Sequence, residues 1–212
     1  MIVTFIDVGQ GDSSLLSTSS GFDILLDGGP RHSGDEVLSY LTSSGVDDLE
    51  VVVISHQDAD HIGGLIDVFQ STIEIDSVIY NGNACTTNTC QSLWGEVAKR
   101  GITPIVVDAG DTFNWGPITT TVLNPQITPT GDENEDSVVM ELSFSDVGIL
   151  YTGDIGDSTE NILLNQGVLN PVDNLKVAHH GSKNSTSMDF FYTTTPENAV
   201  ISVGKNSYGH PA

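Results

Sequence analysis

Basic residues are scarce in this chain. Of its 212 residues, six are Lys or Arg and 29 are Asp or Glu, which gives a formal net charge of −23 at pH 7. Because nucleic-acid affinity depends on the neutralisation of phosphates by Lys and Arg, this surface should repel a polyanion at low salt. The acidic residues are scattered and do not form one tail. Two interpretations stay open: a halophilic surface suited to high salt, where screening removes the self-repulsion, or an ordinary acidic protein.

Long apolar runs are also missing. No stretch approaches the ~20 apolar residues that a membrane-spanning helix needs. The opening residues MIVTFIDVGQGD have the pattern of a strand, not of a secretory leader. A chain that begins after a removed leader would look the same, so secretion stays open.

Cysteine occurs only twice, as Cys85 and Cys90. The four polar residues between them suit a small loop closed by a disulfide. A thiolate metal site is disfavoured, because no further cysteine could complete it. A disulfide would indicate an oxidising compartment, so we expect an extracellular or cell-surface location.

Strand and helix patterns divide the chain into two similar halves. The apolar runs at 2–9 and 22–29 predict a hairpin or meander. The order strands, helix, strand, helix, strand then occurs twice, which predicts an α/β fold of the four-layer αββα sandwich type. We expect residues 1–212 to form a single domain, truncated at its C-terminus, because the chain stops at YGHPA without a closing element. Helices are predicted at 33–45, 61–70, 90–101, 158–167 and 187–195, and strands at 49–56, 76–82, 102–111, 112–125, 174–182 and 197–204. Residues 138–154 are predicted to form two strands around a turn at Asp146–Gly148.

The segment SHQDADHIGG crowds acidic and imidazole side chains together. It contains His56, Asp58, Asp60 and His61 within six positions. Adjacent carboxylates raise each other's pKa and cost stability, but a divalent cation makes the same crowding favourable. Four ligands in one short segment suit two metals that share a bridge. The alternative is a solvated polar loop with two chance histidines.

Further ligands are expected where later strands end. Asp154 follows an apolar strand in ILYTGD and can bridge two metals. His179 and His180 close the strand in KVAHHGS, and adjacent strand residues point to opposite sides. One of them can therefore bind metal while the other serves the substrate or supports the ligands. We expect His180 to be the ligand and His179 its partner, and the reverse assignment stays open. His210 is a third candidate, whereas His32 has no partner pattern and is expected on the surface.

These motifs resemble the metallo-β-lactamase superfamily. The segments DVGQGDS, LLDGG, SHQDADHIGGL, YTGD, KVAHHGS and ISVGKNSYGHP occur in the family's order across nearly the whole chain. They are most similar to the hydrolase domain of ComEC-type competence proteins and their free-standing relatives. The resemblance implies the αββα fold and a centre of two divalent metal ions.

The resemblance also assigns roles to individual residues. His56, Asp58, Asp60 and His61 match the metal motif, and the aspartate in place of the second histidine makes Mn²⁺ a rival to Zn²⁺. Asp154 matches the bridging aspartate, and Asp27 matches the residue that supports the metal loop from behind. The family's middle histidine is missing, and Asn134, Asp136 and Ser137 occupy that region instead. Antibiotic hydrolysis is therefore not expected to be the natural role.

Two metals can turn a bridging water into a hydroxide that attacks a phosphodiester. Asp60, His179 and His210 are the expected catalytic residues, with a histidine protonating the leaving group.

ComEC-type domains are associated with the degradation of one DNA strand during uptake, so the first expected function is a metal-dependent nuclease or phosphodiesterase. A small phosphodiester, phosphocholine ester or lactone is the alternative substrate, and a non-catalytic metal-binding module is the alternative class. Ser182, Lys183 and Lys205 lie near the histidines in sequence and are expected phosphate contacts, and the alternative is that the two lysines are ordinary surface residues. The metal, the substrate and the oligomeric state stay open.

Overall fold

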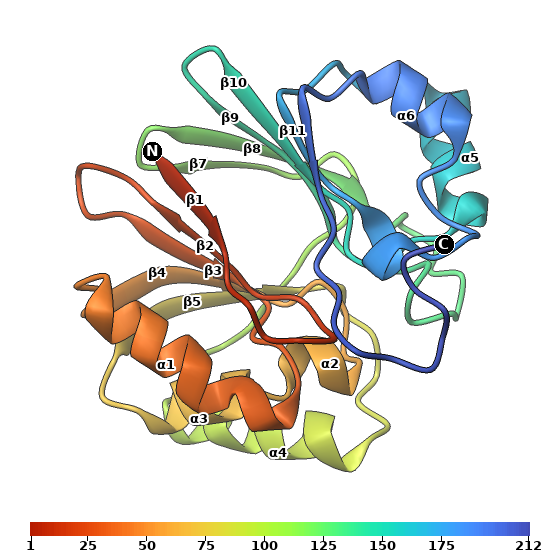
Figure 1. Ribbon diagram of the computed structural model, residues 1–212. Helices are drawn as coiled ribbons and strands as arrows, with labels where there is room; N and C mark the ends of the chain where they lie inside the picture. The colour runs from red at the N-terminus through yellow and green to blue at the C-terminus, as the bar shows by residue number, and fades with distance from the viewer. The chain divides into compact units, whose positions relative to one another are not determined.

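The computed structural model describes all residues 1–212 and divides into two compact units. The N-terminal unit comprises Met1–Val106 and the C-terminal unit comprises Val107–Ala212. Each unit contains its own six-stranded mixed sheet and its own helices (Figure 1). No helix of either unit combines the length and the apolar character that crossing a membrane requires.

In the N-terminal unit, an antiparallel meander is extended by parallel strands. The sheet order is β1-β2-β3-β4-β5-β6, and the strands β3 to β6 pair in parallel. Helices α1, α3 and α4 lie along one face of this sheet (Figure 1). The elements are β1 Ile2–Phe5, β2 Ser14–Ser17, β3 Asp23–Leu26, η1 Arg31–Ser33, α1 Gly34–Ser43, β4 Asp48–Val53, α2 Ala59–Ile62, α3 Leu65–Gln70, β5 Glu74–Tyr80, α4 Asn88–Lys99 and β6 Ile105–Val106.

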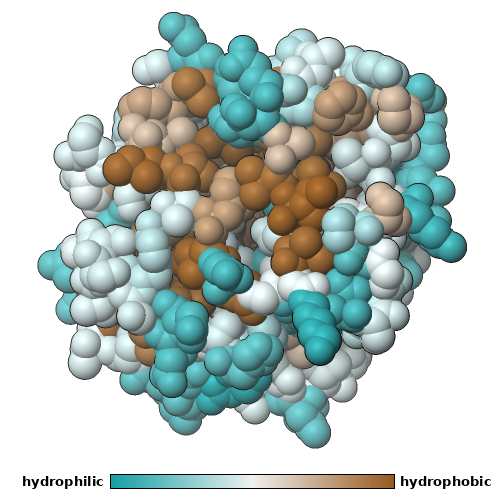
Figure 2. Space-filling model, in the orientation of Figure 1, coloured by the Kyte–Doolittle hydropathy of each residue, from teal (hydrophilic) through white to brown (hydrophobic).

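Apolar residues at helical spacing hold these helices against the sheet. Val37 and Leu41 of α1 and Leu93 of α4 are fully buried, and Val97 of α4 is nearly so. They join one core cluster with the strand residues of β4. The part of the surface drawn over α1, α3 and α4 is mostly hydrophilic (Figure 2), as expected of amphipathic helices.

The C-terminal unit also has a six-stranded mixed sheet in which neighbouring strands follow one another along the chain. Its sheet runs β12-β11-β10-β9-β8-β7, with β7 to β10 antiparallel and β10 to β12 parallel. Helices α5 and α6 pack against each other (Figure 1), and the fully buried ring of Phe190 lies in the core of this unit. The elements are β7 Thr112–Trp115, β8 Ile118–Asn124, β9 Val139–Phe144, β10 Val147–Tyr151, α5 Asp157–Gln166, β11 Asn174–Lys176, η2 Ala178–Gly181, α6 Met188–Thr194 and β12 Asn198–Val200.

The predicted fold class is confirmed, as an α/β fold with two mixed sheets and flanking helices. The predicted order of strands and helices occurs in the C-terminal unit, and the N-terminal unit follows it and then continues with α4 and β6. The disulfide between Cys85 and Cys90 is confirmed as well. The single-domain organisation of residues 1–212 and the C-terminal truncation stay predictions.

Several boundaries were wrong. Ser14–Ser17 forms the middle strand β2, which pairs with both β1 and β3, although a short run flanked by serines has the composition of a turn. The helix predicted at 61–70 consists of two, α2 and α3, because Gly63 and Gly64 interrupt it. The strand predicted at 102–111 is reduced to the two residues of β6.

Candidate metal centre

Three glycine-containing motifs interlock in the N-terminal unit and place the SHQDADH segment. The Gly28 N–H donates to the His61 carbonyl at 2.7 Å, and the Gly64 N–H donates to the Gly29 carbonyl at 2.9 Å. A Cβ at Gly64 would lie 2.1 Å from the Gly28 oxygen, so no other residue fits there. The glycine pairs of LLDGG and HIGG therefore fix the backbone on which His61 sits.

Asp27 accepts hydrogen bonds from both sides of this segment. It follows β3, and its carboxylate accepts the Ser55 N–H at 2.8 Å, the Ser55 hydroxyl at 2.6 Å and His61 Nδ1 at 2.9 Å. The Ser55 oxygen in turn lies 3.0 Å from His56 Nδ1. Since an ionised carboxylate only accepts, His61 carries its proton on Nδ1, and His56 donates from Nδ1 to Ser55. With Nδ1 engaged in this way, Nε2 is the nitrogen that each ring would offer to a metal.

Both imidazoles are fully buried and lie close together. The ring centroids of His56 and His61 are 4.1 Å apart. Burial raises the pKa of Asp27, and the His61 imidazole opposes that rise. The structure thus gives Asp27 contacts that fit the supporting role predicted for it, and it adds Ser55, which sequence reasoning missed.

The two aspartates of the segment lie nearer to solvent. The side chain of Asp58 is 49% exposed, and its Oδ2 lies 3.8 Å from His56 Nε2. Asp58 precedes α2 without capping it through its side chain. Asp60 lies in the first turn of α2 and is half-buried. Neither carboxylate therefore serves as the side-chain cap of α2.

Gln57 anchors the middle of the segment to its surroundings. Its side-chain nitrogen donates to the Asn83 carbonyl at 2.8 Å, and its oxygen accepts the Trp94 indole N–H at 2.7 Å. The Cys85–Cys90 disulfide closes the turn between Asn83 and α4. The chain before and after Gln57 is thereby held in a defined path.

Asp12 is a site residue that the sequence interpretation did not identify. It is buried, and its Oδ2 lies 3.8 Å from His61 Nδ1. Asp12 and His61 offer ligand atoms within 4.8 Å of each other. The Asp12 N–H donates to the Asp60 carbonyl, against which Gly11 packs so closely that a Cβ would lie 2.2 Å away. The only sequence signal was a carboxylate in the glycine-rich turn GQGD.

In the C-terminal unit, Asp154 and His180 form a second buried pair. Asp154 follows β10, and its Oδ2 lies 3.2 Å from His180 Nε2. His180 Nδ1 lies 2.9 Å from the Ser202 carbonyl, which can only accept, so the Nδ1 carries the proton. His180 therefore presents Nε2 on the side of Asp154. This tautomer suits metal ligation.

His179 and His180 do not belong to a strand, so the expectation that strand alternation separates them was wrong. The strand β11 ends at Lys176, and both histidines lie in η2 with positive φ values of 49° and 53°. The two rings nevertheless have different neighbours: His180 lies beside Asp154, and His179 lies 5.4 Å from the ring of His210. Burial, followed by His179 and His180, lowers the pKa of His210. That imidazole is therefore neutral at pH 7.

The region without the family's middle histidine is occupied by hydrogen-bonding side chains. The Asp136 carboxylate accepts the Thr130 and Gly131 N–H groups, and the Ser137 hydroxyl accepts the Asp154 N–H at 3.1 Å. The side-chain oxygen of Asn134 is buried and has no hydrogen-bond partner. This region therefore offers oxygen atoms in place of an imidazole.

The remaining candidates lie at the surface or near it. Lys183 and Lys205 are exposed, and Ser182 is half-buried in the turn after the histidines. His32 is exposed in η1, as predicted.

Glu160 holds the loop that follows the histidines. It is buried on α5, and its carboxylate accepts the N–H groups of Thr186 and Ser187. Burial raises the pKa of this carboxyl, and the hydrogen bonds from Ser187 and Thr186 oppose the rise. A carboxyl whose pKa is raised on folding stabilises the fold below its unfolded pKa of about 4.3, and this contribution is lost as the pH rises through the folded pKa.

The stability of the wild type relative to Glu160→Gln is therefore expected to decrease as the pH rises from about 4.3 towards 8. Urea unfolding across this pH range, in the presence of a chelator, measures the difference. Glu197→Gln, at an exposed glutamate of the same unit, is the control. A difference between wild type and Glu160→Gln that stays constant with pH would contradict the expectation.

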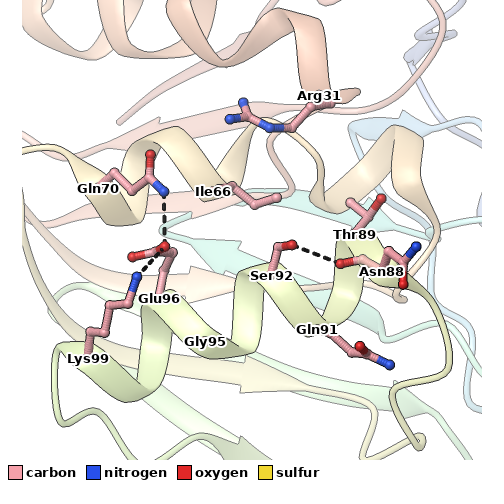
Figure 3. Close-up of a pocket in the computed structure, with 10 residues that line it drawn as sticks. All are labelled: Arg31, Ile66, Gln70, Asn88, Thr89, Gln91, Ser92, Gly95, Glu96 and Lys99. Carbon is pink, nitrogen blue, oxygen red and sulfur yellow. Dashed lines mark hydrogen bonds and ion pairs between the residues drawn. The ribbon is translucent and has the colours of Figure 1, made fainter.

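A separate cavity of about 500 Å³ lies on the helical face of the N-terminal unit (Figure 3). Its two cations are already ion-paired, Arg31 with Asp67 and Lys99 with Glu96. Glu96 also accepts from Gln70 at 2.9 Å, and the hydrogen bond from Lys99 lowers its pKa. The cavity contains no histidine, so it offers no comparable metal donors.

Comparison with known proteins agrees with the fold and the motifs. A family model described as the metallo-beta-lactamase superfamily matches residues 6–205. The chain therefore belongs to the metallo-β-lactamase superfamily. Its histidines and aspartates, buried in pairs in each unit, are of the kind that holds metal ions in proteins.

Among its relatives are proteins named for competence. The chain is 27% identical over 227 residues to ComE operon protein 3 of Bacillus subtilis, an alignment that covers 99% of this chain and 29% of that protein. It is 30% identical over 212 residues to Competence protein ComA of Neisseria gonorrhoeae, covering 99% of this chain and 28% of that protein. The chain thus spans less than a third of the length of these relatives.

A solved structure shares the fold. The metallo-beta-lactamase fold protein YhfI from Bacillus subtilis superposes with a TM-score of 0.60 at 16% identity, covering 100% of this chain and 90% of that one. At this level of identity the likeness concerns the fold alone.

Proposed function

We propose that the chain is a divalent-metal-dependent phosphodiesterase that acts as a nuclease on DNA. The observation that carries the proposal is the set of buried imidazoles whose Nδ1 positions are engaged by Ser55, Asp27 or Ser202, which orients each ring so that Nε2 is its metal-ligating nitrogen. Membership of the metallo-β-lactamase superfamily and the competence-protein relatives support it.

The donor chemistry fits two divalent ions. We assign His56, Asp58, Asp60, His61, Asp154 and His180 as ligands, following the motif order of the superfamily. Mixed imidazole and carboxylate donors suit Zn²⁺ or Mn²⁺, and the buried oxygen of Asn134 adds a hard neutral donor. When bound, the ions would supply Lewis acidity and an activated water.

We assign the other steps of the reaction to side chains around the metal ligands. Asp27 and Ser55 orient the ligating imidazoles, and Asp60 contributes charge near the reacting water. His179 is proposed to protonate the leaving oxygen, whereas His210, neutral at pH 7, accepts a hydrogen bond. Ser182, Lys183 and Lys205 are proposed to contact the phosphate chain.

The net charge of −23 favours a second candidate, a small phosphodiester or a lactone, because an acidic surface repels DNA at low salt. A salty medium would remove this obstacle by screening. We therefore also propose a halophilic protein. The disulfide supports a location outside the reducing cytoplasm, at the cell surface or in the medium.

Cleavage of single-stranded DNA is expected only with Mn²⁺ or Zn²⁺ added, and its rate is expected to increase about tenfold from low to molar NaCl. The assay uses protein of measured metal content, with a chelator-treated sample as the control and bis-p-nitrophenyl phosphate as a parallel substrate. Turnover of the small ester without DNA cleavage at any salt would favour the second candidate. Bound metal without hydrolysis of either substrate would indicate a non-catalytic metal-binding module.

A further inference from the structure

Tyr208 is the most exposed aromatic side chain in the C-terminal unit, at 73%. Its ring lies 5.8 Å from the ring of His210, which lies 5.4 Å from that of His179. A row of three rings thus leads from solvent to the histidine turn that carries His180. The metal chemistry proposed above leaves Tyr208 without a role.

The segment that carries Tyr208 is held by one side chain. Asn206 donates from Nδ2 to the carbonyls of Gly204 and His210, both at 2.9 Å. Its Oδ1 accepts the N–H groups of Tyr208, Gly209 and His210 at 3.0 to 3.2 Å. A single amide therefore fixes both ends of the turn, and Tyr208 is presented to solvent on an ordered backbone.

The same segment is tied to the histidine turn. The Ala212 N–H donates to the Gly181 carbonyl at 2.9 Å. Pro211 packs against Gly181, where a Cβ would lie 2.9 Å from the proline ring. The positions of Tyr208 and His179 are thereby linked through a short, hydrogen-bonded path. A group bound against the Tyr208 ring would therefore have a defined position relative to His179 and His180.

Positive charge accompanies the exposed ring. Lys205 lies in the same segment and Lys183 lies just after the histidine turn, and both are exposed. They are two of only six basic residues in a chain of net charge −23. An exposed ring and exposed lysines on the segments tied to the histidine turn match the two features of a nucleotide, an aromatic base and an anionic phosphate.

We propose that Tyr208 is a base-stacking position, on which an unpaired nucleobase of the substrate stacks while its phosphate lies towards His179. The inference rests on the proposed nuclease function and adds a substrate class, a single-stranded nucleic acid. A base inside a duplex would have no free face for the ring. Because every base has an aromatic face, the stacking tolerates any sequence.

Tyr208→Ala is expected to weaken binding of a fluorescent single-stranded oligonucleotide about tenfold, and Tyr208→Trp is expected to retain it. Fluorescence anisotropy in the presence of a chelator, over a range of NaCl concentrations, measures binding without turnover. Tyr192→Ala is the matched control, since Tyr192 is 66% exposed on α6 of the same unit and lies outside the row of rings. An oligonucleotide with abasic sites is expected to bind wild type and Tyr208→Ala alike.

Two results would overturn the inference. One is equal binding of the normal oligonucleotide by wild type and Tyr208→Ala. The other is an equal loss with the abasic oligonucleotide, which would mean that the substitution acts through the backbone of the turn. Cleavage assays on the same proteins separate the two proposals. If Tyr208→Ala cleaves DNA as the wild type does, the nuclease proposal stands and the stacking position is wrong. If binding depends on Tyr208 but no cleavage occurs, the stacking position stands and the nuclease proposal is wrong.

Discussion

Replacing Asp154 by alanine is expected to lower metal-dependent phosphodiester hydrolysis about a thousandfold, which corresponds to roughly 4 kcal/mol of transition-state stabilisation. The reason lies in its position. Asp154 is buried directly after β10, its backbone N–H is held by Ser137, and its carboxylate faces His180 Nε2 at 3.2 Å. Without this carboxylate, the proposed centre loses the group assigned to bridge its two ions.

The same variant is expected to contain less metal. Elemental analysis after gel filtration measures the metal content, and thermal unfolding in chelator shows whether the variant still folds. Asp146→Ala is the matched control, because Asp146 is an exposed aspartate in the turn before β10. Wild-type hydrolysis and metal content in Asp154→Ala would remove Asp154 from the centre.

Asp27→Asn is expected to weaken divalent-metal affinity by about 10- to 100-fold. Asp27 adopts a left-handed φ of 55°, which asparagine also tolerates, so the backbone should be preserved. The amide replaces one accepting oxygen with an NH₂ group, which would then face the donors of Ser55 or His61. The imidazoles would lose the partner that selects their tautomer.

Competition with a chromogenic chelator measures this affinity directly, without turnover. Asp35→Asn, at an exposed position of α1, is the matched control. The hydrolysis rate at saturating metal should fall less than in Asp154→Ala, because Asp27 acts through the ligands. An unchanged affinity in Asp27→Asn would show that the network around Ser55 serves folding alone.

Features set by neighbouring residues could be predicted from the sequence. The crowding in SHQDADH is visible because its members are adjacent along the chain, and the Cys85–Cys90 pair is visible because only five positions separate its members. The repeated order of strands and helices follows from local apolar periodicity in the same way. These features gave the fold class and the candidate ligands.

Features set by distant contacts could not be predicted. Asp12 reaches His61 only because Gly11 allows the backbone to approach the Asp60 carbonyl. Ser55 acquires its role from Asp27, which precedes it by 28 positions. The left-handed conformations of His179 and His180 depend on the turn into Gly181, so a continuing strand was a reasonable but wrong expectation.

Most of the candidate ligands follow strands that take part in parallel pairing, and Asp12, between β1 and β2, is the exception. Asp27 follows β3, His56 follows β4, Asp154 follows β10 and His180 follows β11. The antiparallel meanders β1–β3 and β7–β10 supply rigid scaffolding, and most of their residues carry no functional group. Loop exchange at the carboxyl ends of the parallel strands is thus the natural route to new specificity. New loops grafted at these positions would leave the hydrophobic core of each unit unchanged.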